Sequence, residues 1–343
     1  MKCLHITDGD RKFIPQFKEF ISENFCGKNH RFVVYSRFSE REIDGFEFFK
    51  LNSLFSYLKI RKSINNSDKI ILHGLLDFHL VFNLLFMPKK KSFFWLVWGG
   101  DLYCYYKRNS SIKEYVRYLV RKFLISRVGN IITYYDDEVI NAKKWFSFNG
   151  NSFQCLLYTS NILNSTPPKP NFSKVSTFTI QVGNSGYPAN NHEMIFKKIK
   201  SYEKDISVRI FCPLAYGNVE YIKSIVKTGR KLFGEDFSYL SSLVEYRKYL
   251  DLIHNCDIAV FDSNRQQAVG NIIPLLGAGK TIFMRLEIEP AKTFLKLGFH
   301  LFNSANFELK ILDERKVEEN MQLSERYFSR NALIDQYASI GLE

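Results

Sequence analysis

The chain has 343 residues, of which 45% are hydrophobic and 24% charged. This is enough apolar sequence for two domains of about 150 residues each, and it excludes a largely disordered chain. Lys and Arg outnumber Asp and Glu by 48 to 35, and the resulting net charge of +13 indicates an anionic partner such as a nucleotide, a phospholipid surface or a nucleic acid.

Short apolar runs alternate with helical patterns along the first half of the chain, as expected of parallel α/β units. Strands are predicted at residues 3–7, 31–36, 69–73, 92–98, 130–134 and 154–158. Helices are predicted at residues 13–25, 78–86, 110–127 and 137–146. Residues 159–176, rich in Pro, Ser and Asn, break both periodicities and are predicted to be a linker.

A second α/β series follows the linker. Its strands are predicted at residues 177–182, 207–211, 257–261 and 281–284, and its helices at 191–202, 219–232, 243–256 and 271–277. We therefore expect an N-terminal domain at 1–165, a C-terminal domain at 166–312, and a helical segment at 313–343 that packs back on the first domain.

The positive charge is concentrated in the first half: residues 1–165 contain 25 Lys and Arg against 15 Asp and Glu. Within it, residues 110–127 read as an amphipathic helix, with apolar residues at intervals of three and four and Lys113, Arg117 and Arg121 on the other side. A solvated charged face is one interpretation, and docking on anionic lipid headgroups is the other.

No apolar run reaches the ~20 residues that a membrane span needs, and we expect no secretory leader. The six cysteines form no CxxC pair, so neither a zinc site nor a disulfide framework is predicted. We therefore expect a cytoplasmic protein that meets a membrane only from its surface, on the inner face of the cytoplasmic membrane.

Three loops that follow predicted strands of the second half are rich in glycine and amide side chains. They read Gly-Asn-Ser-Gly at 183–186, Pro-Leu-Ala-Tyr-Gly-Asn at 213–218 and Asp-Ser-Asn-Arg-Gln-Gln-Ala-Val-Gly-Asn at 262–271. Such loops meet at one edge of a parallel sheet, where glycines and a helix N-terminus suit a diphosphate. Each loop also has a structural interpretation as a turn or a helix cap. The candidate residues for binding the ligand that carries this diphosphate are Gly183, Asn184, Ser185, Gly186, Tyr216, Asn218, Arg265, Gln266, Gln267, Gly270 and Asn271.

In the first half, Trp98-Gly99-Gly100-Asp101-Leu102-Tyr103 closes a predicted strand. We expect Asp101 to project above the sheet edge, where a carboxylate accepts a proton or binds sugar hydroxyls; its structural alternative is a helix cap. His73 ends another strand and is the second candidate, with a structural histidine as its alternative. Asp8-Gly9-Asp10 superficially matches the DxD metal clamp of some glycosyltransferases, but its place between a strand and a helix indicates a turn and a cap.

These motifs, in this order over roughly residues 3–285, resemble the bacterial 4-acetamido-4,6-dideoxygalactosyltransferase family, the TDP-Fuc4NAc:lipid II transferases. The resemblance rests on His73-Gly74, Trp95 with residues 98–103, residues 182–186, Pro213 with 216–218, and 265–267 with Gly270. It implies an α/β protein of the GT-B fold, with two Rossmann-like domains facing a cleft. The flanking sequence is richer in Lys, Asn and Phe than in the enterobacterial members, which leaves the transferred sugar open.

The resemblance further implies a nucleoside-diphosphate sugar donor on the second domain and a lipid-linked or other saccharide acceptor on the first, in bacterial surface glycan synthesis. Trp98, Gly99, Gly100 and Tyr103 would lie on the acceptor side, and Asp101 or His73 would activate the acceptor. No bound metal or other cofactor is implied. Our hypothesis is glycosyl transfer, in which residues 183–186, Arg265 and the helix start at Gly270 and Asn271 neutralise the leaving diphosphate.

Two alternatives stay open at this point. One is an epimerase-like enzyme that modifies a nucleotide sugar on the same scaffold, because a fold does not determine a reaction. The other is a basic nucleic-acid-binding protein, which is disfavoured because the charge accompanies an apolar-backed helix and no recognised binding module. The donor base, the acceptor, the anomeric outcome and the oligomeric state are not determined by these patterns.

Overall fold

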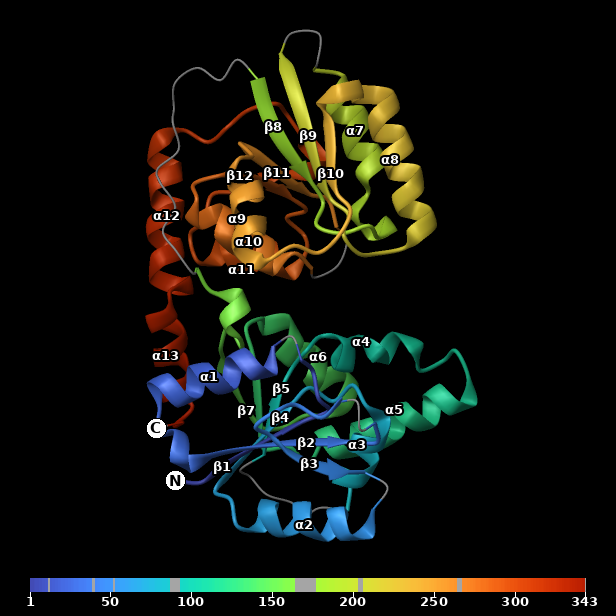
Figure 1. Cartoon of the computed structure of the whole chain (residues 1–343), viewed down its shortest axis with the longest axis vertical. Coiled ribbons are helices and arrows are strands. Elements are labelled where there is room, and N and C mark those ends of the chain that lie inside the picture. The colour runs from blue at the N-terminus through green and yellow to red at the C-terminus, as the bar shows by residue number, and fades with distance from the viewer. Residues whose placement is uncertain are drawn as a thin grey trace. The chain divides into compact units, whose positions relative to one another are not determined.

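The computed structural model describes residues 1–11, 13–38, 41–51, 53–86, 93–163, 177–202, 206–263 and 267–342. It divides into two compact units (Figure 1). Unit 1 comprises Met1–Ser160 and Asn331–Glu343, and unit 2 comprises Asn161–Arg330. Most of the predicted linker, residues 164–176, lies outside the described residues.

Unit 1 is built on a seven-stranded parallel sheet in the order β3-β2-β1-β4-β5-β6-β7. Strand β1, the third in this order, pairs along its whole length with β2 on one side and β4 on the other. The strands are β1 (Cys3–Thr7), β2 (His30–Ser36), β3 (Glu47–Lys50), β4 (Lys69–His73), β5 (Phe93–Leu96), β6 (Asn130–Thr133) and β7 (Asn151–Gln154).

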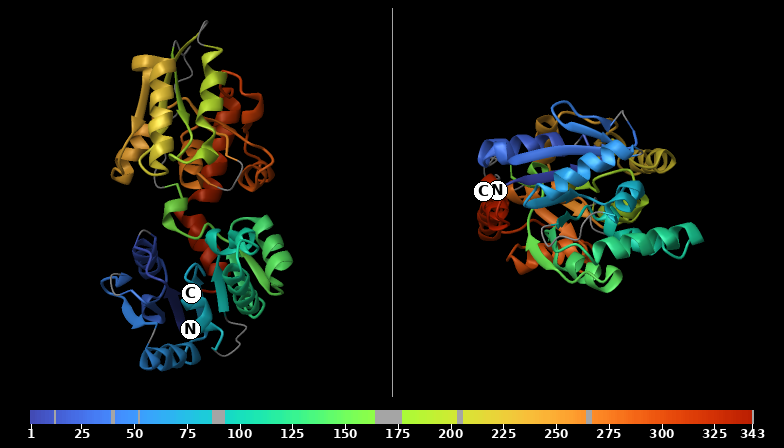
Figure 2. Two further views of the ribbon diagram at one scale, coloured as in Figure 1. Left: turned by 90° about the vertical axis from the view of Figure 1, so that its right-hand side faces the viewer. Right: turned by 90° about the horizontal axis from the view of Figure 1, so that it is seen from below.

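The helices of unit 1 cover this sheet, as expected where parallel strands are buried on both faces. They are α1 (Ile14–Asn24), α2 (Leu54–Asn65), α3 (Phe78–Leu84), α4 (Gly100–Tyr103), α5 (Ile112–Ile125), α6 (Asp136–Phe146) and α13 (Arg330–Ser339). Figure 2 shows α5 extending away from the sheet. The C-terminal segment is anchored in this unit by Tyr337. Its side chain is buried, and its hydroxyl donates a hydrogen bond of 2.6 Å to the Leu157 carbonyl.

Unit 2 repeats the design with a six-stranded parallel sheet in the order β10-β9-β8-β11-β12-β13. Its strands are β8 (Thr177–Val182), β9 (Ser207–Pro213), β10 (Phe237–Leu240), β11 (Ile258–Phe261), β12 (Thr281–Met284) and β13 (Phe302–Asn303). Its helices are α7 (His192–Lys200), α8 (Val219–Phe233), α9 (Tyr246–His254), α10 (Val269–Gly277), α11 (Glu289–Lys296) and α12 (Glu314–Phe328).

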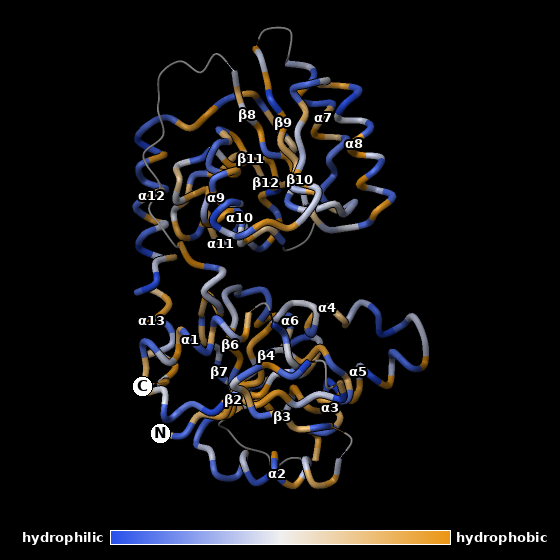
Figure 3. The backbone as a smooth tube through the Cα atoms, viewed as in Figure 1, coloured by the Kyte–Doolittle hydropathy of each residue, from blue (hydrophilic) through white to orange (hydrophobic). Residues whose placement is uncertain are grey.

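Each unit has its own apolar core. Figure 3 shows hydrophobic residues along the strands of both sheets. In unit 1, Trp95 and Phe146 are completely buried, and in unit 2 Phe196 and Phe283 are. The two-domain α/β fold class predicted from the sequence is confirmed.

Several elements differ from the prediction. The strand predicted at 154–158 lies at Asn151–Gln154, and β3, β10, β13, α2 and α11 were not predicted. β3 is a four-residue edge strand with charged ends, and β13 has only two residues, so neither produces a recognisable apolar run. In α2 the apolar residues Leu54, Phe55 and Leu58 are exposed, so the helix lacks the single buried stripe that marks an amphipathic helix.

Candidate functional site

The strand orders locate the sites of both units. In a sheet whose strand order reverses, ligands bind beyond the carboxyl ends of the strands at the reversal. In unit 1 the order reverses between β1 and β4, and in unit 2 between β8 and β11. The loops that leave these four strands are therefore the first candidates for substrate contacts.

In unit 2 the loops after β8 and β9 are joined backbone to backbone through Gly186 and Gly217. Gly186 N donates to the Tyr216 carbonyl at 2.8 Å, and Asn218 N donates to the Gly186 carbonyl at 2.9 Å. A Cβ on Gly217 would lie 2.3 Å from the Gly186 carbonyl oxygen, and Gly217 has a φ of +144°. Glycine is thus required for the two loops to approach this closely.

The loop after β11 joins the loop after β8 through Asn190. The Oδ1 atom of Asn190 accepts from the Asn184 backbone N at 3.2 Å and from Gln267 Nε2 at 3.0 Å, while its Nδ2 donates to the Ser185 carbonyl at 2.9 Å. Gln267 Nε2 also lies 3.2 Å from Asn184 Oδ1. The structure therefore brings Asn184, Ser185 and Gln267 into one network whose centre, Asn190, was not singled out from the sequence.

The start of α10 completes this edge. Gly270 and Asn271 lie in its first turn; the Asn271 N–H donates to the Ala268 carbonyl at 2.8 Å, whereas the N–H groups at the very start of a helix have no acceptor within it. Asn271 Oδ1 is hydrogen-bonded to the Tyr249 hydroxyl and lies 3.4 Å from Gln181 Nε2, which also donates to the Gly183 carbonyl at 3.0 Å. The helix start and the glycine loop are thus tied to each other.

The other residues predicted to bind the sugar donor do not all lie in this network. Asn218 caps α8, accepting from the Tyr221 backbone N at 2.9 Å, as its structural alternative supposed. The Tyr216 ring is half exposed, with its hydroxyl 3.5 Å from Asn184 Nδ2, so one face is free to stack. Arg265 and Gln266 lie outside the described residues.

Asp262, which directly follows β11, is a second residue that the sequence analysis passed over. Its side chain is 1% exposed and accepts hydrogen bonds from the Arg285 guanidinium at 3.1 and 3.2 Å and from the Ser304 hydroxyl at 2.6 Å. Its position at the end of the strand next to the reversal was the signal that could have identified it. The ion pair fixes the base of the loop that continues to Gln267.

In unit 1, Asp101 does not project above the sheet edge as expected. Its side chain is completely buried, and its two oxygens accept from Leu75 N at 2.9 Å, Trp95 Nε1 at 2.7 Å and Trp98 N at 3.0 Å. Burial raises the pKa of Asp101, and the three donors oppose that shift. The carboxylate holds the loops after β4 and β5 together, and no contact in the structure supports its predicted role in acceptor activation.

His73 is also turned inward, as one link of a buried hydrogen-bonded chain. Its Nδ1 lies 2.8 Å from the Tyr158 hydroxyl, and its Nε2 lies 3.0 Å from His5 Nδ1. His5 Nε2 continues to His30 Nδ1 at 2.9 Å, and Trp98 Nε1 donates to Tyr158 at 2.8 Å. The chain crosses the sheet from β2 through β1 to β4.

The direction of this chain follows from the chemistry of its members. An indole N–H can only donate, so the Tyr158 oxygen accepts from Trp98 and its own proton points to His73 Nδ1, its other partner among the described residues. Each neutral imidazole has one donor and one acceptor, so His73 donates to His5. Burial lowers the pKa of His73 to about 3 and that of His5 well below its ordinary value, which keeps both neutral. His73 therefore has no nitrogen left to act as a base.

The residues predicted to lie on the acceptor side follow β5: Trp98 and Gly99 are in the loop, and Gly100 and Tyr103 are in α4. Trp98 is half buried. Gly74 has a φ of +75°, and an added Cβ there would lie 3.1 Å from the Trp98 ring. Glycine at position 74 therefore allows the indole ring to pack against the loop after β4. Gly99, with φ +73°, precedes α4, and Gly100 is exposed. Tyr103 stacks parallel to Tyr106 at 6.4 Å between ring centroids.

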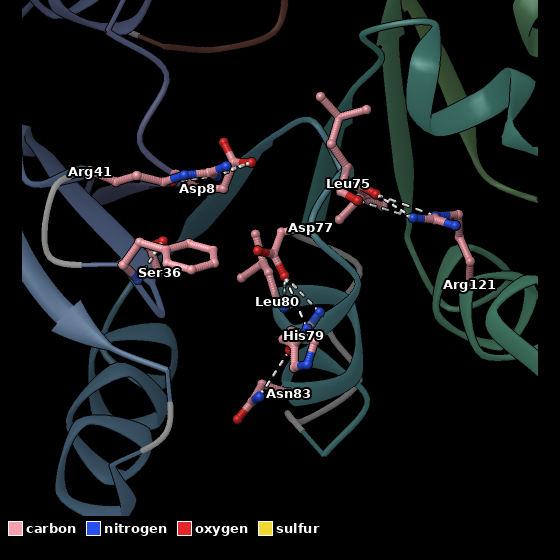
Figure 4. A network of polar contacts seen from close by, with 11 residues as sticks. Asp8, Ser36, Arg41, Leu75, Asp77, His79, Leu80, Asn83 and Arg121 are labelled. Carbon is pink, nitrogen blue, oxygen red and sulfur yellow. Dashed lines mark hydrogen bonds and ion pairs between the residues drawn. The ribbon is translucent and has the colours of Figure 1, made fainter. Parts of the chain in front are cut away.

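Figure 4 shows a further polar group at the same edge, around Asp8 and Asp77. Arg41 Nη1 lies 2.9 Å from Asp8 Oδ2, and Asp77 Oδ1 caps α3 by accepting from His79 N at 2.7 Å. Burial raises the pKa of Asp8; Arg41 lowers it, and the nearby Asp77 and Asp10 raise it further. Asp10 accepts from Phe13 N at 2.8 Å in the turn that precedes α1, so its predicted place in a turn is confirmed, whereas the N-cap of α1 is Phe13.

Helix α5 is oriented differently from the amphipathic prediction. Arg121, assigned to the charged face, is buried and donates to the Leu75 carbonyl at 2.9 and 3.3 Å (Figure 4). Carbonyl groups at the end of β4 need a donor, and a buried guanidinium supplies several. The apolar residues of the helix are instead largely exposed. We call them the apolar stripe: Ile112, Tyr115, Val116, Leu119 and Phe123.

None of the helices that the structure describes is long and apolar enough to cross a membrane.

Comparison with solved structures identifies the architecture. HepE of Anabaena, solved with UDP and glucose, has a TM-score of 0.64 at 11% identity and covers 99% of both chains. The lipopolysaccharide outer core galactosyltransferase WaaB has a TM-score of 0.63 at 9% identity, covering 99% of this chain and 98% of its own. The N-terminal domain of Candida albicans trehalose-6-phosphate phosphatase has a TM-score of 0.66 at 8% identity, covering 99% and 96%. At these identities the likeness establishes a shared fold, that of GT-B glycosyltransferases.

Comparison with protein families identifies the activity. The model of the 4-alpha-L-fucosyltransferase family, glycosyl transferase group 56, matches residues 6–292. The match spans the strand-end loops of both units, and it confirms the glycosyltransferase family expected from the sequence. The chain therefore belongs to the 4-alpha-L-fucosyltransferase family of glycosyl transferase group 56, and it is a glycosyltransferase of the GT-B fold that acts in glycan synthesis.

Proposed function

We propose that this glycosyltransferase binds a nucleoside-diphosphate sugar at the carboxyl edge of the unit 2 sheet and transfers the sugar to a lipid-linked saccharide held at the corresponding edge of unit 1. One observation carries the donor half of the proposal. The loops after β8, β9 and β11 converge at the reversal of strand order, through the Gly186–Gly217 contact and the Asn190 network.

The chemistry of this edge suits a diphosphate. Gly183 and Gly186 let the loop after β8 pack closely, because an added Cβ would lie 2.6 Å from His192 Nε2 at position 183 and 2.2 Å from Ile222 Cγ1 at position 186. The start of α10 offers N–H groups and the positive end of a helix dipole. Arg265, in the loop that leads to α10, supplies the cation that would neutralise the leaving diphosphate. Tyr216 offers an aromatic face for the base or the sugar.

The donor assignment is tested by thermal shift with UDP, TDP, GDP and CMP sugars on the full chain, because a ligand that binds the folded state raises its Tm. We expect one nucleotide class to raise Tm. Replacing Arg265 by Ala should weaken that ligand by about 10- to 100-fold, as expected for loss of a charged hydrogen bond. Lys223→Ala, an exposed change on α8, is the matched control. An unchanged affinity in Arg265→Ala, or no shift with any sugar nucleotide, contradicts the assignment.

The apolar stripe supports a lipid-linked acceptor and an anionic membrane surface as partners. Its residues recur at positions 112, 115, 116, 119 and 123, and Ile112 is 86% exposed. Phe82 of α3, the helix that packs against α5, is also exposed. Lys113 and Arg127 flank the stripe, with the Arg127 guanidinium 5.2 Å from the Phe123 ring centroid. An apolar stripe with a basic border is typical of a surface that lies in the headgroup region of a membrane.

Vesicle flotation tests this surface. We expect the protein to float with vesicles containing a quarter phosphatidylglycerol and less with pure phosphatidylcholine. A Leu119→Ser and Phe123→Ser double variant should lose the anionic-vesicle binding, since about 25 cal/mol is lost per Å² of apolar surface that no longer inserts. Leu243→Ser, at a leucine of unit 2 that is more exposed than either residue of the stripe, is the control. Equal flotation of the double variant and the control would remove the stripe as the membrane contact.

A further inference from the structure

We propose that Asp8 is the catalytic base of the transfer, accepting the proton of the acceptor hydroxyl as that oxygen attacks the anomeric carbon of the donor. In this step the new C–O bond forms, the bond from the anomeric carbon to the diphosphate oxygen breaks, and the nucleoside diphosphate leaves with the electron pair. The proton remains on Asp8. A single displacement of this kind inverts the anomeric configuration. The inference rests on the proposed placement of the acceptor at unit 1.

Asp8 occupies the position that the topology favours. It directly follows β1, one of the two strands at the reversal of strand order in unit 1, and its side chain is 14% exposed. The turn that carries it depends on Gly9, where φ is +94° and an added Cβ would lie 2.6 Å from the Arg41 carbonyl oxygen. Gly9 thereby lets the Arg41 segment close against the end of β1.

The contacts of Asp8 leave it able to accept a proton. Arg41 Nη1 binds Oδ2 at 2.9 Å and the Asp8 carbonyl at 3.2 Å, which orients the carboxylate (Figure 4). Among the residues that the structure describes, none donates a hydrogen bond to Oδ1. A general base needs this arrangement, in which one oxygen is held and the other is available to the hydroxyl.

The other carboxylates of this edge are already used. Asp101 is completely buried, and both of its oxygens accept hydrogen bonds from N–H groups inside the protein. Asp10 accepts a hydrogen bond from Phe13 N in the turn before α1, and Asp77 caps α3 by accepting from His79 N and Leu80 N. At Asp8, partial burial raises the pKa of the carboxyl group, the Arg41 guanidinium opposes that shift, and the two acidic neighbours add to it.

The first test compares Asp8→Asn with Asp77→Asn. Asn has the shape of Asp, still accepts a hydrogen bond from Arg41, and cannot take the proton; at position 77 it caps a helix as well as Asp does. We expect Asp8→Asn to lower kcat by about 10²- to 10⁴-fold, the range for general-base catalysis, with an unchanged thermal shift by the donor. Asp77→Asn, with the same change of charge at the same edge, should stay within a few-fold of the wild type, because burial, the largest cause of the raised Asp8 pKa, remains.

The second test follows protonation directly. The acid limb of the wild-type kcat/KM profile should disappear in Asp8→Asn, and the ¹³C carboxyl resonance that this variant removes should titrate above the ordinary aspartate range near about 3.9. Wild-type turnover in Asp8→Asn, a retained anomeric configuration in the product, or an Asp8 pKa at or below that range would each overturn the inference. Failure of the proposed function looks different, because then no nucleoside-diphosphate sugar raises the Tm of either protein.

Discussion

In unit 1 the loops that leave the strands at the sheet edge carry carboxylates and a histidine, whereas the corresponding loops of unit 2 carry amides and glycines. Both sets lie at a reversal of strand order in a parallel sheet. The shared topology decides where a ligand would bind, and the side chains decide what chemistry is available there. An edge with carboxylates can move a proton, while an edge of amides and N–H donors, with the Asp262–Arg285 ion pair at its base, can hold a diphosphate without taking up its protons.

The two edges also differ in how their polar groups are satisfied. In unit 1, Asp101 and the chain from Trp98 to His30 run into the protein interior, where water does not compete. In unit 2, the Asn190 network is also buried, but it joins neutral amides and backbone groups. Buried charges and buried histidines respond more strongly to mutation and pH than neutral amides do. Three predictions test this contrast.

The largest effect is expected from Asp101→Ala. This change leaves three buried N–H groups, on Leu75, Trp95 and Trp98, without their acceptor, and we expect a loss of about 3 kcal/mol or more of unit 1 stability. The counterpart in unit 2, Asn190→Ala, should cost about 1–2 kcal/mol, because the lost side chain is a neutral amide and hydrogen bonds to a charged group are stronger. Urea unfolding followed by hydrogen exchange in each unit measures both. Equal losses would remove the distinction between a charged and a neutral edge.

The next effect concerns pH. The folded pKa of His73 is about 3, below its unfolded value of 6.5, so the unfolded chain binds the proton first as the pH falls. The contribution of neutral His73 is therefore complete above pH 6.5 and is lost progressively toward pH 3, by about 2 kcal/mol at pH 5. The pKa values of His5 and His30 are lowered by burial as well, so unit 1 should open before unit 2, whose His192 has a pKa of about 4.

Unit-resolved hydrogen exchange between pH 7 and pH 4 measures this order of opening. Because Phe cannot be protonated, the stability of unit 1 in His73→Phe should fall less steeply below pH 6.5 than in the wild type. The same variant should be less stable than the wild type at pH 7. If unit 1 of His73→Phe loses as much stability between pH 7 and pH 4 as the wild type does, or if unit 2 opens first, groups other than His73 determine the acid sensitivity.

The smallest effect is expected at the contact between the two donor loops. Gly217→Ala places a Cβ 2.3 Å from the Gly186 carbonyl oxygen at a φ of +144°, so the loops must separate. We expect a cost of about 1–3 kcal/mol and a loss of the thermal shift caused by the donor. Gly234→Ala is the matched control, because Gly234 also has a positive φ, +55°, but an added Cβ meets nothing within 4 Å. Retained donor binding in Gly217→Ala would show that the contact is not needed for the pocket.

Much of the fold was predictable from local patterns. Five-residue apolar runs such as Cys3–Thr7 and Lys69–His73 can be satisfied only as strands covered on both faces, and they are observed with those bounds. Short edge strands such as β3 and β13 carry too few buried residues to produce a pattern. The convergence of the loops at 183–186, 213–218 and 267–271 was also predictable, because the ends of parallel strands always meet at one edge.

The sequence by itself determined that this chain forms two α/β domains and that it is a glycosyltransferase, and it predicted that the strand-end loops carry the chemistry. Only the tertiary structure decided the direction in which each side chain at those ends points. Asp101 and Arg121 looked solvent-facing in their local patterns, yet both are buried. Unpaired backbone groups at the ends of β4 and β5 needed partners, and only the packed fold reveals that these two side chains supply them. Local periodicity contains no information about such long-range requirements.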